Sequence, residues 1–245
     1  MNCQGPGHAN QQFANKTVEW KGMDSRENFE SNCSNPDSYK KLKDLAWLDT
    51  KIYYSYNSEG FRDIEFNQQP SILALGCSHT EGIGITHDMS WPVQLEKITG
   101  YKVWNLGVGG AALDTCFRLL NFWIHKLNVV SVCCAVPSIE RYEIFKDGRW
   151  NNISPGQKIA GNNWINEYNK NYILYDENYK CNREKNLLAM KQICLEKQVS
   201  FYFDTLEKFR DGAFARDLLH CGPETNIKLA TSFFKQLDGE KNEIN

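Results

Sequence analysis

The sequence predicts an α/β protein: a parallel, flavodoxin-like sheet of about five strands between two layers of helices, an α/β/α sandwich. Short apolar segments alternate with stretches of helical periodicity, and polar or glycine-rich motifs follow several apolar segments. Strands that alternate with helices form parallel sheets, which bind ligands beyond the carboxyl ends of their strands. Functional residues are therefore expected at those ends.

Four segments have the length and apolar content of buried strands. They span residues 71–76, 102–106, 129–136 and 199–203, and such continuous apolar runs are typical of strands covered on both faces. Residues 52–56 also have strand composition and precede a turn, which favours a strand at an edge.

Two helices are clear from their periodicity. Apolar residues recur every 3.6 positions over 113–127, with Asp114, Arg118, Asn121 and His125 on the opposite face, so we expect His125 to be exposed to solvent. The last helix should begin near Pro223 and pack on the sheet through a stripe comprising Ile227, Ala230, Phe233, Phe234 and Leu237.

The chain divides into a polar, largely irregular arm over residues 1–45 and one α/β domain over 46–240. An aromatic-rich insertion interrupts the domain at about 138–181, with Asp147 and Gly148 as a hairpin turn. We expect its rings to pack a small satellite core, and the alternative is that they offer platforms for a sugar.

Composition excludes several classes of protein. The 28 basic and 30 acidic residues give a formal net charge of -2, which does not suit nucleic acid as the main partner. Nine cysteines without a C-x-x-C pair argue against a zinc site or a disulfide framework and suit a reducing compartment. Without a signal-peptide pattern or a membrane-spanning apolar run, we expect a cytoplasmic protein.

Three motifs carry the predicted chemistry. Ser78 follows a buried strand in the loop 76–84, and a serine hydroxyl becomes nucleophilic when a histidine takes its proton and a carboxylate orients that histidine. Asp217 and His220 supply both groups just before the last helix. The turn 105–110 (NLGVGG) offers backbone N–H groups to a developing oxyanion.

These motifs, in this order, resemble the SGNH/GDSL hydrolase family over about residues 52–237. GCSHTEG at 76–82 resembles the first block of that family, G-D-S with a following threonine and glycine. Residues 105–110 look like its second block, and 217–220 are similar to its fifth. NSEGFR at 57–62 resembles a lead-in found in some members.

The resemblance implies a three-layer flavodoxin-like fold and an esterase or acyl-transfer activity without a cofactor. It makes Ser78 the nucleophile, His220 the general base and Asp217 the acid that orients the base. The backbone N–H groups of Ser78 and Gly107 become oxyanion donors. The implied substrates are small acyl esters, with O-acetyl groups on carbohydrate as the leading class.

The chain departs from the family pattern twice. Cys77 stands where the family has the aspartate of G-D-S. The G-x-N-D block, whose asparagine is a third oxyanion donor, is missing, and residues 137–141 (PSIER) stand there instead; losing one such donor costs about two to three orders of magnitude in rate. Arg141 and Asn105 are candidates to replace it.

Alternative interpretations stay open. Ser78 is also suited to capping the following helix, and a Cys77 thiolate near a helix start is also a nucleophile. His79 and His87 are candidates to join His220 around a metal, but no spacing supports one and we expect none. Two other functions are alternatives to a hydrolase: an acyltransferase, and a binding or structural protein that kept the scaffold.

Overall fold

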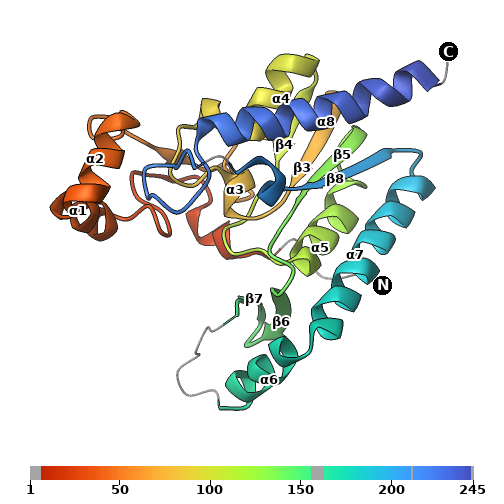
Figure 1. The fold of residues 1–245 in the computed structure, drawn as a ribbon. Helices are drawn as coiled ribbons and strands as arrows, with labels where there is room; N and C mark the ends of the chain where they lie inside the picture. The colour runs from red at the N-terminus through yellow and green to blue at the C-terminus, as the bar shows by residue number, and fades with distance from the viewer. Residues whose placement is uncertain (1–6, 156–162, 211, 244–245) are drawn as a thin grey trace.

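The computed structural model describes residues 7–155, 163–210 and 212–243. Its centre is a four-stranded parallel sheet between two layers of helices (Figure 1), which confirms the expected α/β/α class. In sheet order the strands are β4 (Lys102–Asn105), β3 (Ser71–Leu75), β5 (Val129–Val136) and β8 (Ser200–Thr205). We expected about five strands, but residues 52–56 contribute only β2 (Tyr54–Ser55), which pairs antiparallel with β1 (Thr17–Val18) outside this sheet.

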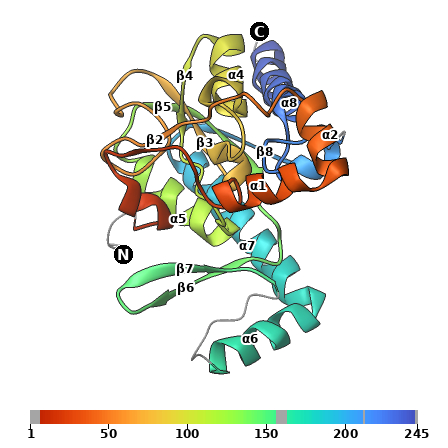
Figure 2. The ribbon, with the colours of Figure 1, turned by 90° about the vertical axis from the view of Figure 1, so that its left-hand side faces the viewer.

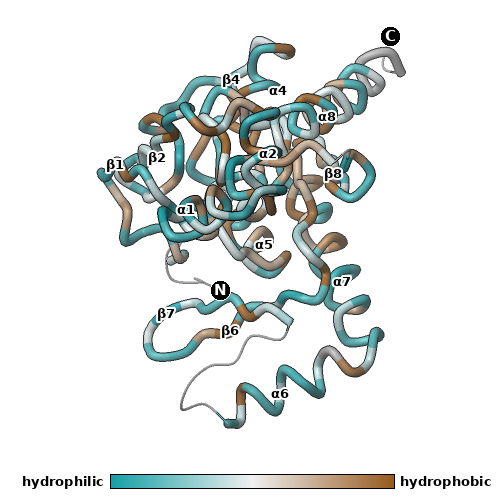
Figure 3. The backbone as a smooth tube through the Cα atoms, turned by 60° about the vertical axis from the view of Figure 1, so that its left-hand side comes forward, coloured by the Kyte–Doolittle hydropathy of each residue, from teal (hydrophilic) through white to brown (hydrophobic). Residues whose placement is uncertain are grey.

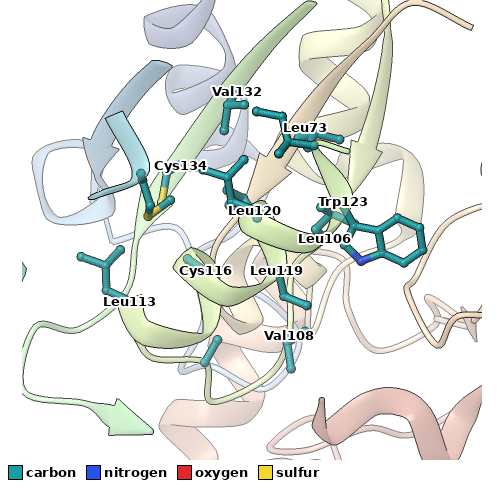
Figure 4. Close-up of a cluster of buried hydrophobic side chains, with 14 of the residues drawn as sticks. Leu73, Leu106, Val108, Leu113, Cys116, Leu119, Leu120, Trp123, Val132 and Cys134 are labelled. Atoms are coloured by element: carbon teal, nitrogen blue, oxygen red, sulfur yellow. The ribbon is translucent and has the colours of Figure 1, made fainter. Parts of the chain in front are cut away.

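Both faces of the sheet are covered because its residues alternate between two hydrophobic clusters. On β3, Leu73 and Leu75 face one cluster, whereas Ile72 and Ala74 face the other. The first cluster lies under α5 (Leu113–Trp123) and α7 (Asp176–Glu196), and Figure 4 shows side chains of α5 meeting those of β3 and β5 there. The second lies under α4 (Trp91–Thr99) and α8 (Pro223–Glu243), which begins where predicted.

The strand order creates a topological switch point. β3, the first of the four strands in the chain, lies between β4 and β5, so the chain leaves β3 toward one edge and β5 toward the other. Connections that diverge in this way leave a crevice at the carboxyl ends of the two strands, where doubly wound sheets bind their ligands. The short helix α3 (Ser78–Glu81) begins at this crevice.

The N-terminal arm differs from the irregular segment we expected. It contains η1 (Ala9–Phe13) and two helices, α1 (Arg26–Ser34) and α2 (Pro36–Asp44), which lie at one side of the sheet (Figure 1). Ser25 caps α1 by accepting from the N–H of Asn28, and Asn35 caps α2, which begins with proline. These caps were readable in the sequence, but the helices have too few apolar residues for periodicity to show them.

The insertion begins with a hairpin of β6 (Tyr142–Lys146) and β7 (Arg149–Ile153), which Figure 2 shows apart from the main sheet. Asp147 and Gly148 have φ angles of 53° and 74°, which confirms the predicted turn because a two-residue hairpin of this kind needs positive φ at both positions. α6 (Asn163–Leu174) follows and is mostly hydrophilic (Figure 3). Part of the predicted insertion, residues 156–162, lies outside the described residues.

A small satellite core joins the hairpin to α6, as expected. Tyr142, Ile153 and Ile165 are its buried members, and Ile144 and Tyr172 pack against them. The remaining short elements are η2 (His87–Met89) and η3 (Leu206–Phe209). Among the described residues, no helix combines the length and the apolar composition needed to cross a bilayer.

Two residues of these helices differ from what their helical faces suggest. Arg118, placed on the outer face of its helix, is buried because its guanidinium binds the Glu143 carboxylate of β6 through Nε and Nη2 at 2.9 and 2.6 Å. Ile227, assigned to the buried stripe of the last helix, is 46% exposed, and Leu229 is buried instead. His125 is exposed, as predicted.

Candidate active site

Ser78 lies at the switch point, as the first residue of α3. Its Oγ is 2.8 Å from Nε2 of His220. The residue that caps α3 is Cys77, whose side chain makes no capping bond, so the Ser78 hydroxyl faces the histidine instead of closing the helix end. No backbone hydrogen bond between described residues uses the N–H of Ser78.

Asp217 orients His220 through both of its carboxylate oxygens. Oδ2 lies in a short contact with Nδ1 of the His220 ring, and Oδ1 accepts from the backbone N–H groups of Leu219 and His220 at 3.0 and 2.9 Å. A carboxylate can only accept, so the ring carries its proton on Nδ1. The lone pair of Nε2 therefore faces the Ser78 hydroxyl.

The Asp217 carboxylate stays ionised although it is 4% exposed. Burial acts to raise its pKa, but the hydrogen bond from the His220 ring, the electrostatic attraction to that ring and the backbone N–H groups of His220 and Leu219 outweigh burial. The pKa of Asp217 is therefore below its usual value. A negative charge beside the histidine stabilises the imidazolium that proton transfer from Ser78 would create.

The loop that carries Asp217 and His220 is held closed by its own backbone. Ala215 N–H donates to the His220 carbonyl at 3.0 Å, and Leu218, with a φ of 56°, turns the chain between them. Arg216 N–H donates to the carbonyl of Gly84, in the loop after α3, at 2.9 Å. This last bond joins the Asp217 loop to the segment that follows Ser78.

His79 packs against the general-base candidate. Its ring centroid is 4.8 Å from that of His220, edge to face, and its Nδ1 accepts from Cys221 N–H at 3.4 Å. Burial is the main cause that lowers the pKa of His79 to about 3, followed by electrostatic repulsion from the His220 ring and from the positive charges of Arg210 and Arg141. His79 is therefore neutral near pH 7 and adds no charge beside His220.

Gly107 and Asn105, two of the predicted oxyanion donors, make hydrogen bonds within the protein. The N–H of Gly107 donates to Oδ1 of Asn105 at 2.9 Å, and Nδ2 of Asn105 donates to the carbonyl of Thr80 at 2.9 Å. Both groups are engaged in joining the glycine turn to α3. A Cβ on Gly107 would lie 2.3 Å from the N of Glu81, so this glycine permits close contact between the two backbones.

Arg141, the other candidate donor, lies in the loop after β5, where its N–H donates to the Ser138 carbonyl at 3.2 Å. Its Nη1 is buried and has no hydrogen-bond partner among the described residues. A role for this group in the reaction stays a prediction.

The alternatives for the neighbouring residues find less support. Cys77 is 3% exposed and belongs to the hydrophobic cluster under α5 and α7, so its sulfur packs in the core. His79 lies beside His220, whereas His87 lies in η2. Within the described part of the chain, no three His, Cys, Asp or Glu side chains gather as a metal site would require.

Sequence reasoning missed the residues that support the site. Asp24 of the arm binds Arg216, next to Asp217, through two hydrogen bonds of 2.8 and 2.7 Å. No local sequence signal reveals a partner this distant. The role of His79 was hidden for a similar reason, since its contact with His220 spans 141 positions, from 79 to 220.

No family model and no curated protein matches this chain. Several solved structures are similar over much of it. A family two carbohydrate esterase from Cellvibrio japonicus is 15% identical, with a TM-score of 0.41 over 74% of this chain and 64% of the other. A family 3 carbohydrate esterase from Clostridium thermocellum is 14% identical, with a TM-score of 0.37 over 69% and 94%.

A member of the lipolytic protein G-D-S-L family from Veillonella parvula DSM 2008 is 12% identical, with a TM-score of 0.36 over 68% of this chain and 97% of the other. Such identities and TM-scores do not establish an activity for this chain. Its site is therefore interpreted from its own residues.

Proposed function

We propose that this protein is a serine esterase that cleaves a carboxylic ester through an acyl-enzyme. The observation that carries this proposal is a chain of two hydrogen bonds, from Ser78 Oγ to the His220 ring and from that ring to the Asp217 carboxylate. A nucleophile within hydrogen-bond reach of a base, which a third group orients, is the signature of nucleophilic catalysis. The motifs that resemble the SGNH/GDSL hydrolases point to the same chemistry.

In the proposed reaction, Ser78 Oγ attacks the ester carbonyl while His220 Nε2 takes its proton. The imidazolium, stabilised by Asp217, then gives this proton to the oxygen of the leaving alcohol, and the acyl group stays on Ser78. Water attacks the acyl-enzyme in the second half, again with His220 as base. The carboxylic acid leaves, and Ser78 regains its proton.

The tetrahedral oxyanion would receive the N–H of Ser78, which is free of other hydrogen bonds among the described residues. The other two expected donors are engaged elsewhere, because the Gly107 N–H donates to Asn105 and the Asn105 amide donates to Thr80. We therefore expect a slow esterase.

Small acyl esters are the proposed substrates, with O-acetyl groups on carbohydrate as the leading class. A cavity of about 1110 Å³ lies between the arm, the glycine turn and the hairpin; it reaches Gly109 and Gly110 of that turn, but Ser78, Asp217 and His220 are not among its lining residues. Its lining includes the aromatic rings of Phe145 and Trp150 and the amide groups of Gln11 and Asn152. Aromatic faces beside amide groups suit a sugar ring.

A second candidate function is a binding protein that kept the scaffold with little catalytic power. The engaged amide groups of Asn105 and Gly107 favour it. Acyl transfer to an alcohol instead of water uses the same Ser78 intermediate, and product analysis with an added alcohol separates it from hydrolysis.

Turnover of p-nitrophenyl acetate tests the proposal. Wild type, Ser78→Ala and His220→Ala are compared with two matched controls, Ser34→Ala in α1 and His125→Ala at an exposed position. We expect both site variants to fall to the background rate and both controls to keep wild-type activity. Equal rates in all five proteins would refute the esterase and favour the binding protein.

A further inference from the structure

Two arginines without partners lie at the same edge of the sheet as Ser78. Arg141 follows β5, and Arg210 follows η3, directly after β8. β5 and β8 are parallel neighbours, and β5 also pairs with β3, so the chain leaves all three strands at one edge. The loops after them flank the start of α3.

Arg141 differs from the buried arginines that the structure describes. Arg118 and Arg216 each bind a carboxylate, Glu143 and Asp24 respectively, and Arg62 donates to backbone carbonyls. The Arg141 guanidinium has no ion pair or hydrogen bond with any described residue, although its Nη1 is buried. Its neighbour Glu140 accepts from the Ser138 hydroxyl at 2.5 Å instead.

An uncompensated guanidinium nitrogen away from water is costly, and an anion that binds it removes this cost. Arg210 is exposed and likewise has no ion pair in the described part of the chain. Arginine presents a planar fork of donors that fits the oxygens of a carboxylate or a phosphate. The two guanidinium groups therefore have the charge and the donors of an anion-binding site.

The loops that carry the two arginines lie at the edge of the sheet where α3 begins with Ser78. The positive charges of both arginines also contribute to the low pKa of His79, after burial and the ring of His220. His79 follows Ser78 in the chain, and its ring contacts that of His220. A group bound between Arg141 and Arg210 would thus belong to the same molecule as the ester that Ser78 attacks.

We propose that Arg141 and Arg210 bind a negatively charged group of the substrate, so that the enzyme prefers esters that carry a carboxylate or a phosphate. This inference rests on the proposed esterase activity and names its substrate class. It gives Arg141 a role in binding rather than in the oxyanion hole. The two arginines select the substrate, and Ser78, together with His220 and Asp217, performs the chemistry.

The test compares kcat/KM for matched esters. Mono-p-nitrophenyl succinate carries a carboxylate on its acyl part, and the p-nitrophenyl ester of succinamic acid is its neutral counterpart. 4-Acetoxybenzoate and 4-acetoxyphenyl phosphate place a carboxylate or a phosphate on the alcohol part, with phenyl acetate as their neutral counterpart. These arms distinguish the kind of anion and the side of the ester that carries it.

We expect at least one anionic ester to exceed its neutral counterpart by about tenfold or more, since a hydrogen bond to a charged group contributes that much. Arg141→Gln should remove this preference through KM. Arg210→Gln should reduce it, and Arg26→Gln, an exposed arginine of α1, should not. Added salt should lower the preference because it screens charges.

Equal kcat/KM for every anionic ester and its neutral counterpart overturns the inference, as does an equal loss of kcat for both in Arg141→Gln. A further experiment tests the anion site independently of the proposed esterase activity. Binding of methyl succinate monoanion and of methyl phosphate to Ser78→Ala is measured by calorimetry, with and without Arg141→Gln. Binding that needs Arg141 in a protein without esterase activity supports the anion site alone, and no binding in either form overturns it.

Discussion

Asp24 and Arg216 form a buried, two-pronged ion pair that joins the N-terminal arm to the loop of the candidate active site. Their side chains are 1% and 3% exposed, and both carboxylate oxygens of Asp24 accept from the guanidinium. The guanidinium also lies over the ring of Trp20 at 4.2 Å. Because Asp217 follows Arg216, the arm helps to position the proposed catalytic acid.

Replacing Asp24 with alanine should lower both the stability of the protein and its esterase activity. The loss of one partner leaves the Arg216 charge buried and unpaired, which costs about 3–5 kcal/mol. Urea unfolding measures this loss. The matched control is Asp176→Asn, which removes an exposed pair with Lys180 and should leave the midpoint unchanged. An unchanged midpoint in Asp24→Ala would mean that the arm does not anchor the loop.

Gly107→Ala should destabilise the protein because no space exists for a methyl group beside the backbone of α3. Overpacking of this kind costs about 1–3 kcal/mol and shifts the backbone. Gly239→Ala in α8 is the control, since nothing lies within 4 Å of its Cβ position and alanine favours helices. Thermal unfolding compares the two, and a Gly107→Ala protein as stable as Gly239→Ala would contradict the packed contact.

His79→Leu should change how stability depends on pH. The pKa of His79 is about 3 in the folded protein and 6.5 in the unfolded chain, so between these values the unfolded state binds more protons. The wild-type protein therefore has its full stability above pH 6.5. Below this pH its free energy of unfolding falls by up to about 1.4 kcal/mol per pH unit. The leucine variant lacks this loss. The free energies of unfolding of the two proteins, measured between pH 4.5 and 7, should therefore converge or cross as the pH falls; parallel curves would refute the neutral histidine.

Asp217→Asn should lower kcat for p-nitrophenyl acetate by about three to four orders of magnitude while Ser78 and His220 remain. An amide can donate to Nδ1 of His220, which would move the ring proton to Nε2, where it cannot accept from Ser78. Steady-state kinetics measures kcat, and circular dichroism checks the fold. A loss of less than tenfold would show that Asp217 does not set the tautomer.

The sequence predicted the central sheet well because its strands are continuous apolar runs that end at glycine or polar turns. The hairpin turn at Asp147 and Gly148 and the start of α8 at Pro223 followed from local backbone preferences. Short, polar elements such as α1 and β1 were missed, because their stability depends on caps and on distant pairing rather than on periodicity.

The candidate site was predictable in its residue types but not in its hydrogen bonds. Ser78, Asp217 and His220 lie together as their motifs indicate. Sequence cannot show that the Gly107 N–H is already bound to Asn105, or that Arg118 turns inward to Glu143. Such pairings depend on side-chain directions that only the folded chain fixes.

Labelling with a fluorophosphonate tests the central claim most directly, namely that His220 activates Ser78. The probe reacts covalently with activated serines, and mass spectrometry of the digested protein identifies the modified residue. We predict an adduct on Ser78 in wild type and in His125→Ala, and its loss in His220→Ala. An unlabelled Ser78 in wild type, or labelling of Ser78 in His220→Ala equal to that in wild type, would contradict the proposed activation of Ser78 by His220.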